Sequence, residues 1–185
     1  MLPRKEKTMK KAYFAGGCFW CITPVFRDME GVFSVTAGYC GGDEENPAYQ
    51  DVKTQKTHHR ETICVVYDPE QASYRDLVTV FLECVDPFDG GGQFIDRGMS
   101  YTPALYYTDE AERILAGEML SALAEKEGKT PAVSVEPYKQ FWPAEDYHQD
   151  YDLKNPEAFA LEVAGSGRGS VSCPLRFRKK KRTGG

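Results

Sequence analysis

The sequence predicts an α+β fold in which helices cover a sheet as a two-layer sandwich. The expected elements follow one another as β-α-β-β-α-β-α-β, an order that contains the split βαβ core of ferredoxin-like domains. The chain has 185 residues, of which 41% are hydrophobic, enough for one domain with a core of its own. We find no internal repeat and no segment that indicates a second domain.

The first strand and helix are expected on either side of a double glycine. An apolar run at residues 12–15 ends at the glycines and predicts a strand. Thr23 followed by Pro24 is typical of a helix N-cap with proline at the first helical position. We therefore expect a helix that runs to about Glu30 and ends before Gly31.

Two further strands enclose a short helical piece. Residues 32–39 and 60–67 are rich in β-branched and apolar side chains, and each run ends at a turn. Between them, Asn46 and Pro47 predict the start of a short helix that contains Tyr49.

The second half of the chain contains two stronger helix patterns. Ser73 and Asp76 have capping-box spacing, and the helix that follows is stopped by Pro87. Its apolar face consists of Leu77, Val78, Phe81, Leu82 and Val85. Residues 109–127 predict another helix, which ends at Gly128. The residues expected to point inward are Leu115, Met119, Leu120 and Leu123.

The remaining strands and the C-terminal region are less regular. Residues 103–108 and 132–135 predict strands on either side of the second long helix. Beyond them we expect a long irregular C-terminal segment, with a short helix possible after Pro143.

Charge is segregated along the chain. We expect a flexible leader at residues 1–10, one domain at 11–164, and a Gly/Ser-rich and then basic tail at 165–185. Residues 12–175 hold 12 bases and 27 acids, which argues against nucleic-acid binding by the body of the protein. The basic run at 176–182 could meet RNA or an anionic membrane, although such runs are more often solvated tails.

The sequence predicts a cytoplasmic protein. No run of 18 apolar residues is present, which excludes a membrane-spanning helix. The basic N-terminus is followed by only four residues, 12–15, before the glycines, too short for a signal peptide. Cysteines in a reducing compartment are more often catalytic than structural. The six cysteines contain one C-x-x-C pair and no second close pair, so we expect no metal site.

The strongest local motif is Gly-Gly-Cys-Phe-Trp-Cys at residues 16–21. Cys18 and Cys21 are expected on or just before the first turn of a helix, where amide donors and the macrodipole lower a thiol pKa. The glycines allow a tight turn that leaves the sulfur accessible, and C-x-x-C spacing permits a disulfide. The alternative is that Cys18 is a small buried apolar residue.

Other candidate residues are polar side chains at strand ends and in loops. Glu61 shares a strand face with apolar residues, where desolvation would raise its pKa and suit it to donate a proton. The alternative is a strand-end carboxylate in solvent. A glycine-rich connection at residues 88–98 has the length of a functional loop and could place Asp96 and Tyr101 over a site, or leave them exposed.

In combination, these residues resemble the peptide methionine sulfoxide reductase A family, in the variant with a second Cys after the Trp. The resemblance covers about residues 11–170. The segments that carry it, beyond residues 16–21, are Ala37-Gly38-Tyr39-Cys40-Gly41-Gly42, Asn46-Pro47-Ala48-Tyr49, His59-Arg60-Glu61, Val66-Tyr67-Asp68-Pro69, residues 91–98 and residues 144–149. The family reduces the S epimer of methionine sulfoxide, free or in proteins.

The resemblance implies a role for each candidate residue. Cys18 matches the nucleophile that attacks the sulfoxide sulfur, and Glu61 matches the group that protonates or hydrogen-bonds the sulfoxide oxygen. The remaining matches are Tyr49, Tyr101 and Asp96 for the polar side of the site, and Phe19 and Trp20 for the pocket of the S-methyl group.

The sulfenic acid left on Cys18 requires a second thiol. Either Cys21 or Cys173 could resolve it, and we prefer Cys21 because its position near Cys18 is fixed. The resemblance implies recycling by thioredoxin or another thiol, no bound cofactor, and a monomer whose substrates are oxidised proteins and free methionine sulfoxide. Two rival interpretations are a thioredoxin-like dithiol oxidoreductase using Cys18 and Cys21, and a nucleic-acid-binding protein using the basic tail.

Overall fold

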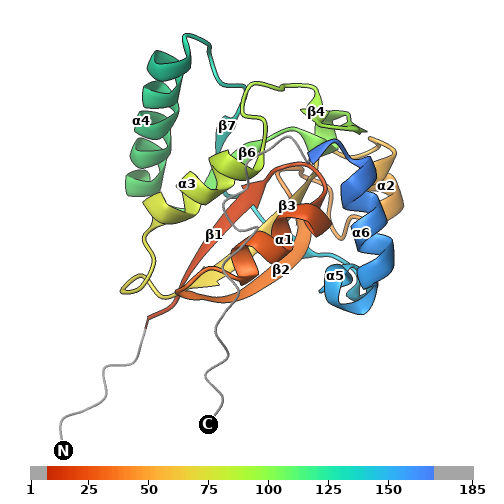
Figure 1. Ribbon diagram of the computed structural model, residues 1–185. Coiled ribbons are helices and arrows are strands. Elements are labelled where there is room, and N and C mark those ends of the chain that lie inside the picture. Colours follow the sequence, from red (N-terminus) through yellow and green to blue (C-terminus); the bar gives the residue numbers. More distant parts are fainter. Residues whose placement is uncertain (1–7, 169–185) are drawn as a thin grey trace, which may run out of the picture.

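A six-stranded sheet forms the centre of the molecule (Figure 1). The structure is a computed structural model and describes residues 8–168. The strand order is β7-β6-β1-β3-β2-β8, with antiparallel neighbours except for the parallel pair β6–β7. The strands are β1 (Lys10–Ala15), β2 (Val32–Cys40), β3 (Arg60–Tyr67), β6 (Ala104–Tyr107), β7 (Ser134–Pro137) and β8 (Phe141–Pro143).

Helices and a small hairpin surround this sheet. The helices are α1 (Phe19–Arg27), α2 (Tyr49–Lys53), α3 (Tyr74–Cys84), α4 (Glu110–Glu127), α5 (Tyr151–Lys154) and α6 (Pro156–Gly165). The hairpin consists of β4 (Gly92–Gln93) and β5 (Asp96–Arg97), and 3₁₀ turns lie at Met99–Tyr101 and Asp146–His148. The predicted α+β class is confirmed.

The two faces of the sheet have different neighbours. Phe14 of β1 points toward α1 and α3 and stacks near Phe26 and Phe81, with ring centroids 5.3 and 5.5 Å away. Because side chains alternate along a strand, the neighbouring Tyr13 points to the opposite face. There its ring stacks on that of Tyr138, with the ring centroids 4.3 Å apart. The core on this opposite face consists of Tyr13, Ala15, Cys40, Cys64, Ala104 and Tyr106.

Several expected elements are confirmed at their boundaries. Strand β3 covers residues 60–67 as predicted. The capping box of α3 is present, with Asp76 N–H donating to Ser73 Oγ at 3.1 Å and Ser73 N–H donating to Asp76 Oδ2 at 2.8 Å. Helix α4 ends at Gly128, whose φ of +65° is the left-handed conformation that glycine adopts readily.

The predicted start of the first helix is wrong. Helix α1 begins at Phe19, with Cys18 as its N-cap. Thr23 is inside the helix and its hydroxyl donates to the carbonyl of Phe19 at 2.7 Å. Pro24 is also internal, and the helix ends at Arg27, before the expected Glu30. The cysteine motif, rather than the Thr-Pro pair, therefore marks where the helix begins.

The expected irregular C-terminal segment is also wrong. Residues beyond β7 form β8, α5 and α6. Strand β8 pairs with β2, and the ring of Tyr151 in α5 stacks on Trp20 at 3.8 Å. These elements depend on partners more than 100 residues earlier in the chain, which local periodicity does not reveal. The Asn155-Pro156 start of α6 was a local signal that we missed.

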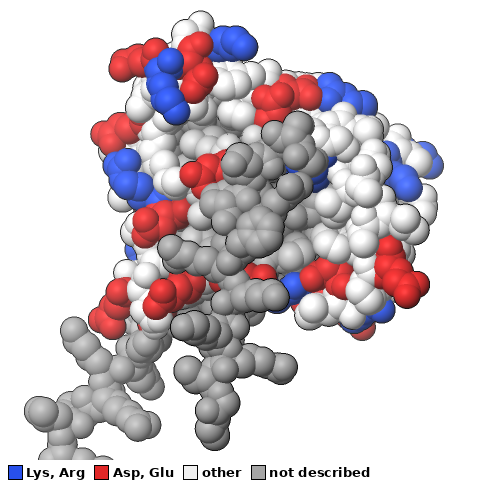
Figure 2. Space-filling model, in the orientation of Figure 1, with Lys and Arg blue, Asp and Glu red and all other residues white. Residues whose placement is uncertain are grey.

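Several expectations concern residues outside those described, or absences. Cys173 and the basic run at 176–182 lie outside residues 8–168. No helix in that range is long and apolar enough to cross a membrane. Within the same residues, no group of three or more His, Cys, Asp or Glu is arranged to hold a metal ion. On the face drawn in Figure 2, basic and acidic side chains are interspersed.

Candidate active site

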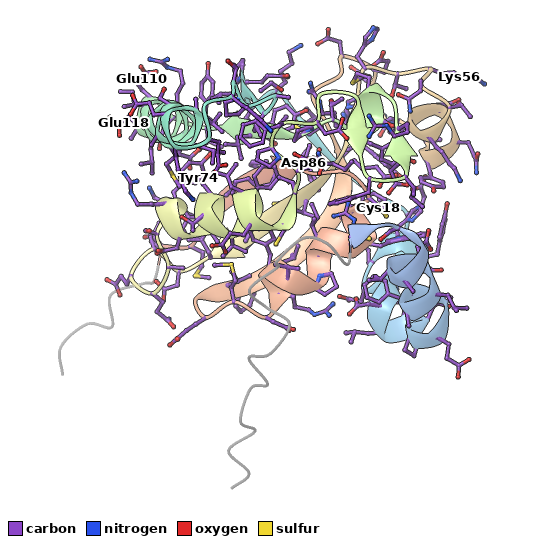
Figure 3. The ribbon with its side chains drawn as sticks, turned by 45° about the horizontal axis from the view of Figure 1, so that its top comes forward. Cys18, Lys56, Tyr74, Asp86, Glu110 and Glu118 are labelled. Carbon is purple, nitrogen blue, oxygen red and sulfur yellow. The ribbon has the colours of Figure 1, made fainter. Side chains whose placement is uncertain are left out.

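Cys18 lies where strand β1 turns into helix α1. The turn requires a glycine at position 17, because its φ is +79° and an added Cβ would lie 2.6 Å from the Cβ of Gln93. The backbone thus places Cys18 at the N-cap of the helix. The residue is 8% exposed and therefore buried, so the expectation of an accessible sulfur is wrong. Figure 3 shows Cys18 close to α6 and the β4–β5 hairpin.

Glu61 of β3 faces the start of the same helix. It is 2% exposed, and its Oε2 accepts a hydrogen bond of 3.1 Å from the Phe19 N–H. Burial raises the pKa of Glu61 to about 8, although the Phe19 N–H favours the ionised form. Of the two interpretations of Glu61, the structure supports the desolvated carboxyl. The strand-end carboxylate in solvent, which the residues alone favoured, is wrong. Near neutral pH this carboxyl is protonated and able to donate.

Cys21 lies one turn after Cys18 on α1. Its N–H donates to the Cys18 carbonyl at 3.1 Å, and each thiol shifts the pKa of the other. The hydrogen bond with Cys21 and burial raise the pKa of Cys18, whereas the hydrogen bond from Cys18 lowers the pKa of Cys21. We expected a lowered pKa at Cys18. That expectation is wrong: after Cys21, burial and the nearby Glu61 and Asp96 carboxyls also raise the pKa.

Two tyrosines complete the polar side of the site. Tyr101, in the 3₁₀ turn, is 8% exposed, and Tyr49 begins α2. Burial, followed by the charge of Glu61, raises the pKa of both hydroxyls, so both remain protonated donors. The Cys18 thiol also raises the pKa of both hydroxyls. The two tyrosines, Glu61 and Cys18 are therefore close enough to influence one another.

The hairpin supplies Asp96. This carboxyl is half-buried on β5, and burial raises its pKa. The loop is held by Gln93, whose side-chain amide accepts from Asp86 N–H at 2.7 Å and donates to Asp86 O at 2.8 Å. The expected long loop is therefore ordered, and it places Asp96 beside the cysteine pair.

Aromatic side chains form the other wall. Phe19 is 1% exposed, and its ring centroid lies 5.9 Å from that of Tyr39. Trp20 stacks on Tyr151 and donates from Nε1 to Nδ1 of the buried His148 at 3.2 Å. An indole N–H only donates, so His148 carries its proton on Nε2, which faces a Glu145 oxygen at 3.7 Å.

Some residues that support the site were missed by the sequence reasoning. Gln55 donates to Ser100 Oγ at 2.7 Å and accepts from Ser100 N–H at 3.0 Å, which joins the region after α2 to the Tyr101 turn. Gln149 accepts from Ala37 N–H at 2.9 Å and donates to Ala37 O at 2.8 Å. Each of these glutamines binds a residue far away in the sequence. Such a contact leaves no local pattern, so no signal in the sequence could have identified either residue.

The chain is similar to known proteins along most of its length. A sequence model described as peptide methionine sulfoxide reductase matches residues 10–172. Peptide methionine sulfoxide reductase MsrA of Ligilactobacillus salivarius (strain UCC118) is 48% identical over 83% of this chain and 91% of that protein. MsrA 2 of Staphylococcus aureus (strain Mu50) is 43% identical over 87% of this chain and 92% of that protein.

A solved structure has the same fold. Mxr1 from Saccharomyces cerevisiae in its reduced form superposes with a TM-score of 0.77, at 28% identity over 83% of this chain and 89% of that chain. The buried cysteine at the start of a helix and the buried glutamate lie within the residues that these sequence matches cover. The chain belongs to the peptide methionine sulfoxide reductase A family, a family of enzymes.

Proposed function

We propose that this protein reduces methionine S-sulfoxide to methionine, both free and in oxidised proteins, with Cys18 as nucleophile and Glu61 as proton donor. The observation that carries the proposal is the pairing of a buried thiol at the start of α1 with a buried carboxyl that accepts the Phe19 N–H at 3.1 Å. A protonated carboxyl suits a sulfoxide oxygen, on which negative charge develops as the sulfur is attacked.

The first step forms an S–S bond to the substrate and then transfers oxygen. The Cys18 sulfur attacks the sulfoxide sulfur while Glu61 protonates its oxygen. Methionine then leaves and Cys18 becomes a sulfenic acid, so that one thiol and one sulfoxide yield one sulfenic acid and one thioether. Cys18 gives up its thiol proton in this step, and Glu61 is reprotonated from solvent before the next turnover.

The substrate sulfoxide is bound between a polar side and an aromatic side of the site. Tyr49, Tyr101 and Asp96 hold the sulfoxide oxygen from the polar side. Phe19 and Trp20 enclose the S-methyl group. The Trp20 ring is held by stacking on Tyr151 and by the hydrogen bond from its Nε1 to His148.

Cys21 resolves the sulfenic acid in this proposal, with Cys173 as the second choice. The position of Cys21 supports this choice, because it lies one turn after Cys18 on α1 and each thiol shifts the pKa of the other. Thioredoxin, or another dithiol, then reduces the Cys18–Cys21 disulfide, and no bound cofactor takes part. Yeast Mxr1 has been solved in complex with Trx2, an assembly of the kind that such recycling requires.

The same proposal includes a ferredoxin-like two-layer core, a cytoplasmic location and a monomer. The order β6-β1-β3-β2 with antiparallel neighbours supports the split βαβ core, since α1 and α3 are the two crossover helices and share one face. Boundaries at residues 11–164 for the domain remain our prediction.

A coupled assay separates this proposal from a thioredoxin-like dithiol oxidoreductase. We expect NADPH oxidation through thioredoxin reductase and thioredoxin when methionine S-sulfoxide is added, and none with the R epimer. Reduction of insulin disulfides without sulfoxide turnover would contradict the proposal. Deleting residues 174–185 tests the nucleic-acid rival, which requires salt-sensitive RNA binding by the full chain.

Disulfide mapping identifies the resolving thiol. After oxidation by one equivalent of methionine S-sulfoxide, mass spectrometry should find Cys18 linked to Cys21. A Cys18–Cys173 bond would replace our choice of resolving residue.

A further inference from the structure

Arg168 reaches from the end of α6 to the turn that carries Cys18. Its Nη2 lies 3.3 Å from the carbonyl oxygen of Gly16, and its Nη1 lies 3.4 Å from the carbonyl oxygen of Cys84. The guanidinium also lies over the ring of Phe94, 4.8 Å from its centroid. One side chain thus joins the end of α6, the end of α3, the hairpin and the turn before α1.

The turn is shaped to admit this guanidinium. A Cβ added to Gly17 would lie 2.7 Å from Nη2 of Arg168 as well as against Gln93. A side chain at position 17 would therefore displace Arg168 in addition to straining the backbone. The close approach indicates that Arg168 is part of the structure around the cysteine pair.

The charges around the two thiols are arranged asymmetrically. Cys18 faces the carboxyls of Glu61 and Asp96, both of which disfavour a thiolate. Cys18 and, after it, the positive charge of Arg168 lower the pKa of Cys21, whereas burial and the charges of Asp96 on β5 and Glu162 on α6 raise it. The positive charge of Arg168 also lowers the pKa of Asp96, against the larger effect of burial, which raises it.

We propose that Arg168 is a positioning residue for the second step: anchored on the carbonyl oxygens of Gly16 and Cys84, it keeps a positive charge beside Cys21, so that Cys21 attacks the sulfenic acid as a thiolate. This inference rests on the proposed function. In the step, the Cys21 sulfur forms a bond to the Cys18 sulfur, the S–O bond of the sulfenic acid breaks, and the oxygen leaves as hydroxide that takes a proton to become water.

The test measures the two steps separately in the full chain. Without reductant, the first methionine released reports step one, and loss of dimedone-reactive Cys18 reports step two, each followed from pH 6 to pH 9. The variants are Arg168→Met, which keeps length but loses charge, and Arg168→Lys, which keeps charge. Arg113→Met on α4 is the matched control, because Arg113 forms an exposed ion pair with Glu110.

For Arg168→Met we expect methionine release within about threefold of the unaltered chain and a roughly tenfold slower second step at pH 7, since reactivity follows the thiolate fraction. The slow step should recover toward pH 9, and Arg168→Lys should restore much of the rate at pH 7. Arg113→Met should change neither step.

Three results would overturn the inference. The second step could keep its rate and pH dependence in Arg168→Met, or both steps could fall together with a lowered melting temperature. The effect of Arg168→Met could also vanish when Cys173→Ser is added, which would assign the role to the tail. If the unaltered chain releases no methionine from the S-sulfoxide, the proposed function fails instead.

Discussion

The two faces of the central sheet both bury cysteines, but only one has the surroundings of a reactive thiol. Cys18 is 8% exposed on the α1 side, whereas Cys40 and Cys64, on the opposite face, are 0% and 6% exposed. Burial raises the pKa of Cys40 to about 12 and also raises that of Cys64. Because the Cys18 pKa is raised as well, neither burial nor resting pKa distinguishes the two groups.

The difference lies in backbone position and neighbours. Cys18 begins a helix, has a second thiol one turn away and faces a buried carboxyl. Cys64 is in mid-strand, opposite Tyr13 of β1. Neighbouring residues of a strand point to opposite faces of the sheet. Along the pair β2–β3, Tyr39 is opposite Glu61, and Cys40, one residue further, is opposite Arg60. What distinguishes Cys18 is therefore its neighbours: a carboxyl that can donate a proton and a second thiol that can form a disulfide.

Replacing Cys18 should have the largest effect on this contrast. Cys18→Ser should lower reductase activity by at least about 1000-fold, because a serine hydroxyl is a far weaker nucleophile at neutral pH. The measurement is NADPH oxidation in the thioredoxin-coupled assay, with near-native circular dichroism as the check on folding. Substantial activity in Cys18→Ser would show that another thiol is the nucleophile.

Glu61→Gln should be the next most damaging change. Loss of the proton donor should lower kcat about 100- to 10,000-fold with KM little changed, since general acids act chiefly in the transition state. In the unaltered chain, activity should fall as pH rises through about 8, where Glu61 ionises. The Gln variant should lack that decline, and a normal rate in it would contradict the role of Glu61 as acid.

The same substitution should change stability in the opposite direction. The folded-state pKa of Glu61 is about 8, above its ordinary 4.5, so the unaltered chain loses stability as pH rises from about 4.5 through 8. Glu61→Gln should become relatively more stable over that range, by on the order of 1.4 kcal/mol per pKa unit of the shift. Denaturant unfolding at pH 5 and pH 8.5 measures this, and an equal difference at both values would refute it.

A smaller effect is expected where the two tyrosine-bearing segments are joined. Gln55→Ala removes both hydrogen bonds to Ser100 and should lower kcat/KM about tenfold by loosening Tyr101 relative to Tyr49. Gln55→Glu should recover most of the loss, because its carboxylate can accept from both Ser100 N–H and Ser100 O–H. Failure of that rescue would indicate a different role for the amide.

Sequence predicted those parts of the molecule whose determinants are local. The limits of β3 and the capping box of α3 follow from residue type and spacing. The burial of Glu61 does not, since a glutamate at the end of a strand usually reaches solvent. The start of α1 was misplaced because a Thr-Pro pair is a common cap, yet here the helix begins one residue after Cys18. Strand β8 and the glutamine side chains that bind Ser100 and Ala37 depend on distant partners, which a single sequence does not display.

The smallest effect should come from the opposite face. Cys40→Ala should leave sulfoxide reduction within about twofold and lower the free energy of unfolding by about 1 kcal/mol, as expected for a small buried side chain that takes no part in chemistry. Activity assays and chemical denaturation measure the two quantities. A loss of turnover as large as that of Gln55→Ala would show that the two faces are coupled.

Helix α4 has a practical consequence. It packs against α3, β6 and β7, and Figure 3 shows its residues Glu110 and Glu118 well away from Cys18. A Cβ added at Gly117 in the middle of this helix meets nothing within 4 Å. An unnatural amino acid at position 117 could therefore anchor the enzyme to a solid support or an electrode while its sulfur chemistry proceeds undisturbed on the far side.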